Sequence, residues 1–322
     1  MVSNMDITQI AEAVKEAGTI ALAIHKNPDS DCVGSATALL IALRRMGKTV
    51  HIFADGNIPG RLGFLTEKSF FNSDTKKRYD VCLAIDVASE QLMGYVKEEV
   101  FDKAKIKCCI DHHGTNPGYA DFNYVDGGAA AAGELIYFFI KDFLFQDVTP
   151  DIAMRLYAAI ASDTGSFQYS NTTPRTHLIA SELMATGMDA PMVMRTLFER
   201  KTKEQLMLKA EVTNNLKFYA DGKICVALVD NEILSKYSMA FEEADDIAAL
   251  PRSIIGVEVG AYIKVKGEKE CKISLRSNEY VDVSAVAKEM GGGGHIRAAG
   301  VTLYESPEEA ERLIVKALEK VL

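Results

Sequence analysis

The sequence has few cysteines, and none of them has the spacing of a zinc site or a disulfide framework. Its six cysteines include no CxxC pair, and four of them lie in apolar, strand-like segments. Cysteines of this kind are typical of buried, reduced thiols in a cytosolic protein. We therefore expect free thiols.

Long apolar segments are also missing. The longest, residues 129–140, contains Glu134 and is shorter than the about 20 residues that a membrane span needs. The first residues show no basic region followed by an apolar segment. We therefore expect no signal peptide, no membrane partner and a cytoplasmic location.

Positive charge is in deficit, and the net charge is −9. Non-specific binding of nucleic acid depends on Lys and Arg side chains that neutralise phosphates. We therefore expect neither a general nucleic-acid binder nor a protein that binds long duplexes. A short phosphorylated substrate held by metal ions remains compatible with the charge.

The length of the chain predicts two domains. Its 322 residues exceed the about 250–300 residues at which a single hydrophobic core stops growing. In the first half, strand-like segments 19–24 and 49–53 flank a helical segment, 33–46, as in a βαβ unit with parallel strands. A further helix is expected around residues 92–104.

The second half differs in pattern, because strands such as 254–265 outnumber the helical segments. The predicted fold is α/β, with a mainly parallel sheet flanked by helices in residues 1–190. A helical linker is predicted at 191–217 and a smaller mixed α+β domain at 218–322. The active site is expected in the cleft between the two domains.

Costly polar side chains follow three of the apolar strands. Segment 106–110 runs into Asp111, His112 and His113, segment 19–24 into His25, and segment 81–85 into Asp86. Open α/β sheets bind ligands beyond the carboxyl ends of their strands. Taken singly, such a residue is more often a cap or a satisfied polar group. Together they favour a shared site, because each unpaired buried charge would cost several kcal/mol.

The candidate ligands are carboxylates and imidazoles, a set that suits Mn²⁺ or Mg²⁺. There are more carboxylates than one ion needs, and without cations they would repel one another and stay partly protonated. We therefore expect a centre with two Mn²⁺ ions, with Mg²⁺ or another divalent ion as the alternative. The full set is His25, Asp29, Asp31, Asp86, Asp111, His112, His113 and Asp163.

Four consecutive glycines, residues 291–294, precede His295. Backbone N–H groups of glycine can approach a phosphate or a base closely, because no Cβ intervenes. A flexible linker is the plain alternative. The adjacent imidazole and the helix-like pattern of residues 296–299 favour a binding loop.

These motifs together resemble the DHH phosphoesterases. The resemblance rests on His25-x3-Asp29-x-Asp31, Asp86, Asp111-His112-His113 and Asp163-Thr164-Gly165, and residues 291–300 look like the GGGGH run of the associated DHHA1 domain. It covers nearly the whole chain. The length and layout are most similar to the stand-alone bacterial members, which degrade short oligoribonucleotides and dephosphorylate 3′-phosphoadenosine 5′-phosphate.

The resemblance implies a role for each residue, with residues 1–190 as the DHH catalytic domain and 218–322 as the DHHA1 substrate-binding domain. Asp86 would bridge the two ions, His113 would face the scissile phosphate, and Asp111 would orient its neighbours. The first ion would be held by His25, Asp29 and Asp86, the second by Asp31, Asp86, His112 and Asp163, and the substrate by Arg276, Gly293, Gly294 and His295.

The expected function is hydrolysis of short oligoribonucleotides to mononucleotides, of 3′-phosphoadenosine 5′-phosphate to AMP, or of both. A cyclic or linear diadenylate phosphodiesterase is the enzymatic alternative, and a nucleotide-binding regulator without catalysis is the other. The sequence does not rank these substrates. It also leaves open the direction of degradation and the assembly state, a homodimer being one option.

Overall fold

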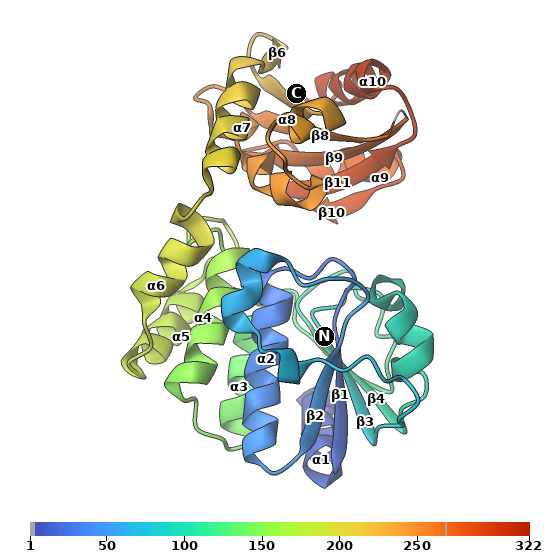
Figure 1. Cartoon of the computed structure of the whole chain (residues 1–322), viewed down its shortest axis with the longest axis vertical. Helices are drawn as coiled ribbons and strands as arrows, with labels where there is room; N and C mark the ends of the chain where they lie inside the picture. Colours follow the sequence, from blue (N-terminus) through green and yellow to red (C-terminus); the bar gives the residue numbers. More distant parts are fainter. Residues whose placement is uncertain (1–3, 268) are drawn as a thin grey trace. The chain divides into compact units, whose positions relative to one another are not determined.

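The structure is a computed structural model that describes residues 4–267 and 269–322 (Figure 1). The chain divides into two compact units, Met1–Arg200 and Lys201–Leu322, called here the first and the second unit. Helices α6 (Ala190–Met194) and α7 (Lys203–Asn214) lie in the predicted linker region. The function of 191–217 as a linker stays a prediction.

The first unit is built on a parallel sheet of five strands in the order β2-β1-β3-β4-β5, which confirms the predicted sheet. The order reverses at β1, so β1 and β3 are neighbours at a topological switch point, where open sheets bind ligands. The strands are β1 (Thr19–Ala23), β2 (Thr49–Phe53), β3 (Val81–Ile85), β4 (Ile106–Asp111) and β5 (Phe122–Val125).

Alternation along the strands gives the first sheet two different faces. In β3, Leu83 and Ile85 point into the larger hydrophobic core, whereas Cys82 and Ala84 point into a smaller one on the opposite side. The larger core is shared with helices α1 (Asn4–Glu16), α2 (Ser30–Arg45), α3 (Ala132–Phe138), α4 (Pro150–Asp163) and α5 (Pro174–Ala185).

Helices α2 and α4 pack closely, and Gly34 permits this contact. A Cβ at Gly34 would lie 2.5 Å from the carbonyl oxygen of Arg155 on α4. This contact sets the beginning of α2 against α4, whose last residue is Asp163. Both helix ends carry predicted metal ligands.

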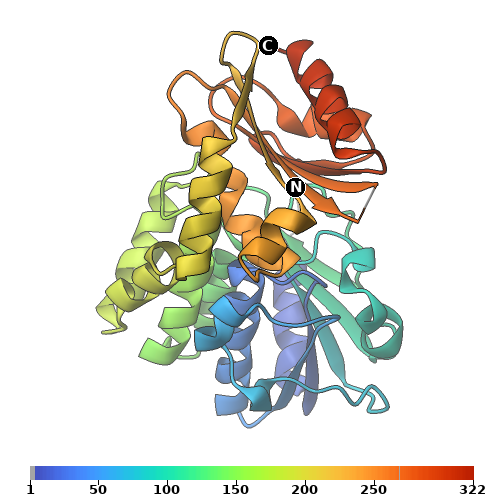
Figure 2. The same cartoon turned by 45° about the horizontal axis from the view of Figure 1, so that its top comes forward.

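The second unit contains a mixed sheet of six strands in the order β10-β11-β9-β8-β7-β6, antiparallel except between β7 and β8. Helices α9 (Val283–Glu289) and α10 (Pro307–Glu319, red in Figure 2) cover one face, and α7 and α8 (Asn231–Lys236) pack on the other. The strands are β6 (Lys217–Tyr219), β7 (Ile224–Val229), β8 (Val259–Lys266), β9 (Glu270–Ser277), β10 (Gly293–His295) and β11 (Ala298–Leu303).

Three predicted segments differ from the structure. Residues 92–104 do not form one helix: a 3-10 turn, Glu90–Met93, is followed by Gly94 with φ of +58° and a π-helical turn, Lys97–Phe101. The strand predicted from 254 begins only at Val259. The helix-like interpretation of 296–299 is wrong, because β11 begins at Ala298 and pairs with both β10 and β9.

All six cysteines are buried free thiols, as predicted. Of the helices in the described part of the chain, none combines the length and the apolar character needed to cross a membrane.

Candidate active site

The predicted ligands of the first unit come together at the carboxyl ends of its central strands. His25 lies two residues beyond β1, Asp86 directly follows β3, and Asp111 is the last residue of β4. Asp31 lies in the first turn of α2 and Asp163 ends α4. Residues 25–31 form one continuous segment, so four separate segments of the chain supply one cluster: 25–31, 86, 111–113 and 163.

One group of ligand atoms surrounds the ring of His112. Its Nε2 lies 3.3 Å from Asp163 Oδ2, 3.5 Å from Asp86 Oδ1 and 3.7 Å from Asp31 Oδ2. The other ring nitrogen, Nδ1, lies 3.3 Å from the carbonyl oxygen of Ala129. A carbonyl can only accept, so Nδ1 donates to it and Nε2 is left to face the carboxylates. Asp31, His112 and Asp163 can therefore serve as ligands of one ion.

Asp31 is fully buried and held in place by α3. Its carboxylate accepts hydrogen bonds from the backbone N–H groups of Ala132 at 2.6 Å and Gly133 at 2.9 Å, and from Ser35 Oγ at 3.0 Å. The amides at the start of a helix favour a negative charge. The alanine-rich segment before α3 thus orients a carboxylate with its backbone.

Asp86 is the most unusual residue of the cluster. It is 2% exposed, its φ is +57°, and within residues 4–267 and 269–322 its Oδ1 has no hydrogen-bond partner. A non-glycine residue in this conformation costs about 1–3 kcal/mol, and a buried carboxyl oxygen without a hydrogen bond adds to that cost. Such a residue suits a site where a cation supplies the missing interaction.

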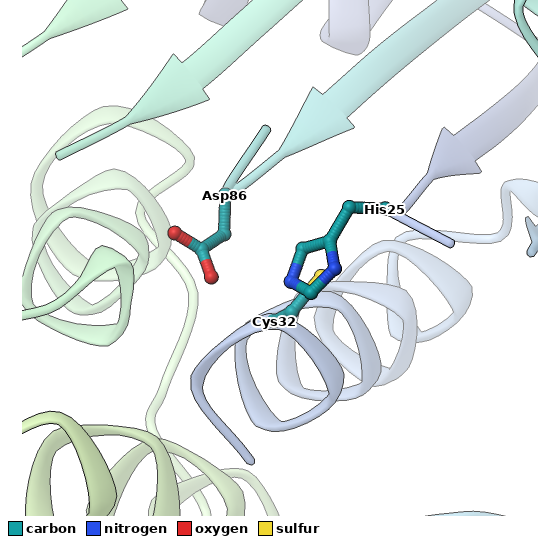
Figure 3. Close-up of side chains that lie close together, drawn as sticks. All are labelled: His25, Cys32 and Asp86. Atoms are coloured by element: carbon teal, nitrogen blue, oxygen red, sulfur yellow. The ribbon is translucent and has the colours of Figure 1, made fainter. Parts of the chain in front are cut away.

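A second group of ligand atoms consists of His25, Cys32 and Asp86, whose donor atoms all lie within 4.8 Å of one another (Figure 3). Asp29 belongs to none of the groups found in the described residues. Its carboxylate is exposed and caps α2 by accepting from the backbone N–H of Cys32 at 3.0 Å. The function of Asp29 as a ligand stays a prediction.

His113 is oriented by Asp111, and Asp111 by Asn116. His113 Nδ1 lies 2.8 Å from Asp111 Oδ1, and Asn116 Nδ2 donates to Asp111 Oδ2 at 2.7 Å. Burial disfavours a charge on both partners. The Asp111 hydrogen bond and charge outweigh burial and raise the pKa of His113, while bonds from His113 and Asn116 outweigh it and lower the pKa of Asp111. The pair therefore favours a protonated His113 imidazole next to an ionised Asp111 carboxylate.

The pKa values of three of the carboxyl groups predicted as metal ligands shift in the opposite direction from that of Asp111. Burial, reinforced by neighbouring carboxylates, raises the pKa values of Asp31, Asp86 and Asp163. Burial lowers the pKa of His25, which favours the neutral imidazole that binds metals. The protein alone therefore disfavours the ionised cluster, and divalent cations would restore it. The oxygen and imidazole donors fit Mn²⁺ or Mg²⁺.

In the second unit, Arg276 and His295 lie in one row of the sheet. Ala298 of β11 pairs with His295 of β10 on one side and with Arg276 of β9 on the other. Directly paired residues face the same way, and strands are about 4.8 Å apart, so the two side chains start about 10 Å apart on one face. The next row, with Leu275 and Ala299, points into the hydrophobic core.

The glycine run forms the edge of this sheet. Gly294 has φ of +142°, and a Cβ there would lie 2.5 Å from the carbonyl oxygen of Ala298, so no other residue fits. A Cβ at Gly293 would meet no described atom within 4 Å. Gly294 therefore shapes the hairpin, whereas the backbone at Gly293 is open to a ligand.

Two residues of the site were missed by sequence reasoning. Cys32 directly follows Asp31, and its Sγ donates to the carbonyl oxygen of Ile85 at 3.5 Å, beside Asp86. Asn116 lies three residues beyond His113 and also donates to the carbonyl oxygen of Val87 at 3.1 Å. Only proximity to a motif could have indicated either residue.

Comparison with known proteins agrees with this architecture. Residues 19–160 match the DHH family, N-terminal domain, and residues 221–322 match the DHHA1 domain. The bifunctional oligoribonuclease and PAP phosphatase NrnA of Thermus thermophilus is 32% identical over 91% of this chain and 87% of its own. The protein of the same name from Bacillus subtilis is 27% identical over 95% of this chain and 96% of its own.

A solved structure shows the same fold. An exopolyphosphatase-related protein from Bacteroides fragilis superimposes with a TM-score of 0.91 at 24% identity, over 99% of this chain and 97% of its own. The resemblance of the motifs, the buried carboxylate cluster and the near full-length relatives agree. The chain therefore belongs to the DHH family of metal-dependent phosphoesterases and carries a DHHA1 domain in its second unit.

Proposed function

We propose that this protein hydrolyses short oligoribonucleotides to mononucleotides and 3′-phosphoadenosine 5′-phosphate to AMP. The observation that carries the proposal is the buried cluster around Asp86. Among the described residues its Oδ1 has no hydrogen-bond partner, and the raised pKa values of the carboxyl groups indicate a site that divalent cations would complete. The near full-length relatives named as oligoribonucleases and PAP phosphatases support this choice of substrates.

We propose that the cluster holds two Mn²⁺ ions. His25 and Asp86, with Asp29, would hold the first, and the second would take Asp86 with the group of Asp31, His112 and Asp163. When bound, such ions acidify water for attack and neutralise charge on the phosphoryl oxygens. The residues around them keep the donors aligned, since Ala129 fixes the tautomer of His112 and the start of α3 fixes Asp31.

His113 is proposed to act on the substrate itself. Asp111 accepts from Nδ1–H and raises the pKa of His113, which favours the doubly protonated ring. In that form the other ring nitrogen, Nε2, also carries a proton and can donate it to a phosphate oxygen or to the departing oxygen. Asn116 keeps Asp111 from rotating away. Asp111 is then a positioning residue, because its effect on the reaction passes through His113.

The second unit is proposed to capture the distal part of the substrate. Arg276 can offer its planar guanidinium to a phosphate, and His295 can bind a phosphate or stack on a base from the same face. The spacing of about 10 Å between them suits two groups of one short nucleotide chain, not a single phosphate. Gly293 offers open backbone beside them.

The test is a side-by-side assay of the purified protein with Mn²⁺ on a short RNA, 3′-phosphoadenosine 5′-phosphate, and cyclic and linear diadenylate. We expect the first two to be hydrolysed with the higher kcat/KM. The Asp86→Asn protein, purified in the same way, controls for contaminating nucleases. A higher kcat/KM for a diadenylate would reject the proposed substrates, and nucleotide binding without turnover would identify a regulator.

A further inference from the structure

One feature of the metal centre has no place in the proposed reaction: the thiol of Cys32. It is fully buried, and its Sγ donates to the carbonyl oxygen of Ile85, the residue before Asp86. The sulfur, a ring nitrogen of His25 and a carboxylate oxygen of Asp86 lie within 4.8 Å of one another. Figure 3 shows the three side chains beyond the ends of the strands, with the sulfur of Cys32 partly hidden behind the ring of His25 in this view.

This arrangement matches a soft metal site. Zinc binds sulfur at about 2.3 Å and nitrogen or oxygen at about 2.0–2.2 Å, so ligand atoms around one ion lie within the observed separation. Thiolate and imidazole select Zn²⁺ and related ions, whereas Mn²⁺ prefers oxygen. Asp86 is 2% exposed and belongs both to this group and to the group around His112, whose Nε2 lies 3.5 Å from Asp86 Oδ1. That oxygen has no hydrogen-bond partner in the described residues, which independently indicates that the carboxyl group is placed for a cation.

We propose that His25, Cys32 and Asp86 form a site for a thiophilic divalent cation of the Zn²⁺ class, which competes with Mn²⁺ and inhibits the enzyme. On binding, the thiol gives its proton to the solvent and the sulfur becomes a ligand. Asp29, which stands outside this group as the cap of α2, would serve the hard ion only. The inference concerns the same centre as the proposed function, but not its substrate.

The first experiment uses Cd²⁺ as the probe, because a thiolate bound to Cd²⁺ absorbs in the ultraviolet. The full-length protein, freed of metal, is titrated with Cd²⁺, and we expect a charge-transfer band that requires Cys32. Cys32→Ser should lose the band and Cys82→Ala should keep it. Cys82 is the matched control, since it is equally buried on β3 but points into the smaller core. A band that persists in Cys32→Ser would overturn the proposal.

The second experiment begins with a measurement on the wild-type protein. X-ray absorption of the Cd²⁺-loaded protein should show one sulfur in the metal's coordination shell, and a shell without sulfur would overturn the proposal even if Cys32→Ser fails to fold. In the Mn²⁺ assay, Cys32→Ser should raise the Zn²⁺ concentration for half-inhibition by at least about tenfold, the scale of effects on metal affinity at such sites. An unchanged value would contradict competition at this site.

The two proposals fail separately. A sulfur-containing Cd²⁺ shell without hydrolysis of any nucleotide would reject the proposed substrates and retain the soft-metal site. Normal hydrolysis without a cadmium–thiolate band would reject only the soft-metal site.

Discussion

The two units carry opposite kinds of chemistry. In the first, carboxylates and imidazoles gather at the ends of strands, most of them at least half-buried, and neighbours orient some of them, as Ala129 orients His112 and Asn116 orients Asp111. In the second, His295 is exposed on a short edge strand, and open glycine backbone lies beside it. Buried, preorganised groups are expected to determine turnover, and exposed groups to determine substrate binding.

The largest effect should come from Asp86→Asn. Asparagine keeps the shape and tolerates the positive φ, but it removes the charge that the cations share. Transition-state stabilisation by bound ions is worth several kcal/mol, so we expect kcat to fall by about 10³-fold or more. The measurement is steady-state hydrolysis with Mn²⁺.

Asp80→Asn is the matched control for Asp86→Asn. Asp80 flanks the same strand at its other end, where it accepts from the backbone N–H groups of Gly18 and Thr19. Its loss should leave turnover intact. Full Mn²⁺-dependent turnover in Asp86→Asn would contradict the view that the buried groups of the first unit determine turnover.

The same contrast explains what the sequence could predict. A ligand that directly follows a strand is placed by that strand, so His25, Asp86 and Asp111 could be assigned to one edge of the sheet. Asn116 depends on a loop that folds back onto Asp111. Cys32 depends on the packing of α2 against the end of β3. Contacts between segments that are distant along the chain leave no periodic pattern in the sequence, so they could not be predicted from it.

The two wrong predictions of helical structure have a similar origin. Residues 92–104 have a helical composition, but Gly94 adopts a positive φ, which interrupts a helix, and the next backbone N–H, that of Tyr95, donates to Asp55 Oδ2 at 3.1 Å. Residues 296–299 read as helix-like, but strand pairing of Ala298 with Arg276 overrides local preference. In both segments, contacts with residues distant in the sequence determine the secondary structure.

The next effect in size concerns His113. If its proton is transferred in the reaction, His113→Gln should lower kcat by about 10²-fold or more, and activity in the wild type should fall as pH rises through the pKa of His113. Asp111 raises that pKa. Asp111→Asn should therefore move the alkaline limb of the kcat/KM profile to lower pH, and His113→Gln should abolish the limb. An unmoved limb in Asp111→Asn would contradict the positioning role.

A smaller effect is expected in the second unit. His295→Ala should raise KM by about tenfold, the scale of one hydrogen bond to a charged group, and leave kcat nearly unchanged. Lys272→Ala is the control, because Lys272 is exposed on β9 four residues from Arg276 and on the same face. A lost kcat with unchanged KM would place His295 with the chemical groups of the first unit instead.

The smallest effect is a change in the stability of the metal-free protein with pH. The unfolded chain protonates Asp86 near 3.8, whereas burial raises its pKa well above that value in the folded state. The folded protein therefore binds the proton first, so stability from this group is lost as pH rises through the folded pKa and regained as pH falls.

Thermal unfolding of wild type and Asp86→Asn, both without metal, isolates this group. The melting temperature of the wild type should rise relative to the variant as pH falls from neutral toward 3.8, by a few degrees, since 1 kcal/mol shifts a unit of this size by about 2–4 °C. Mn²⁺ at neutral pH should stabilise the wild type far more than the variant. A difference that stays constant with pH would mean that Asp86 is already paired in the metal-free protein, and the need for a cation would lose its physical basis.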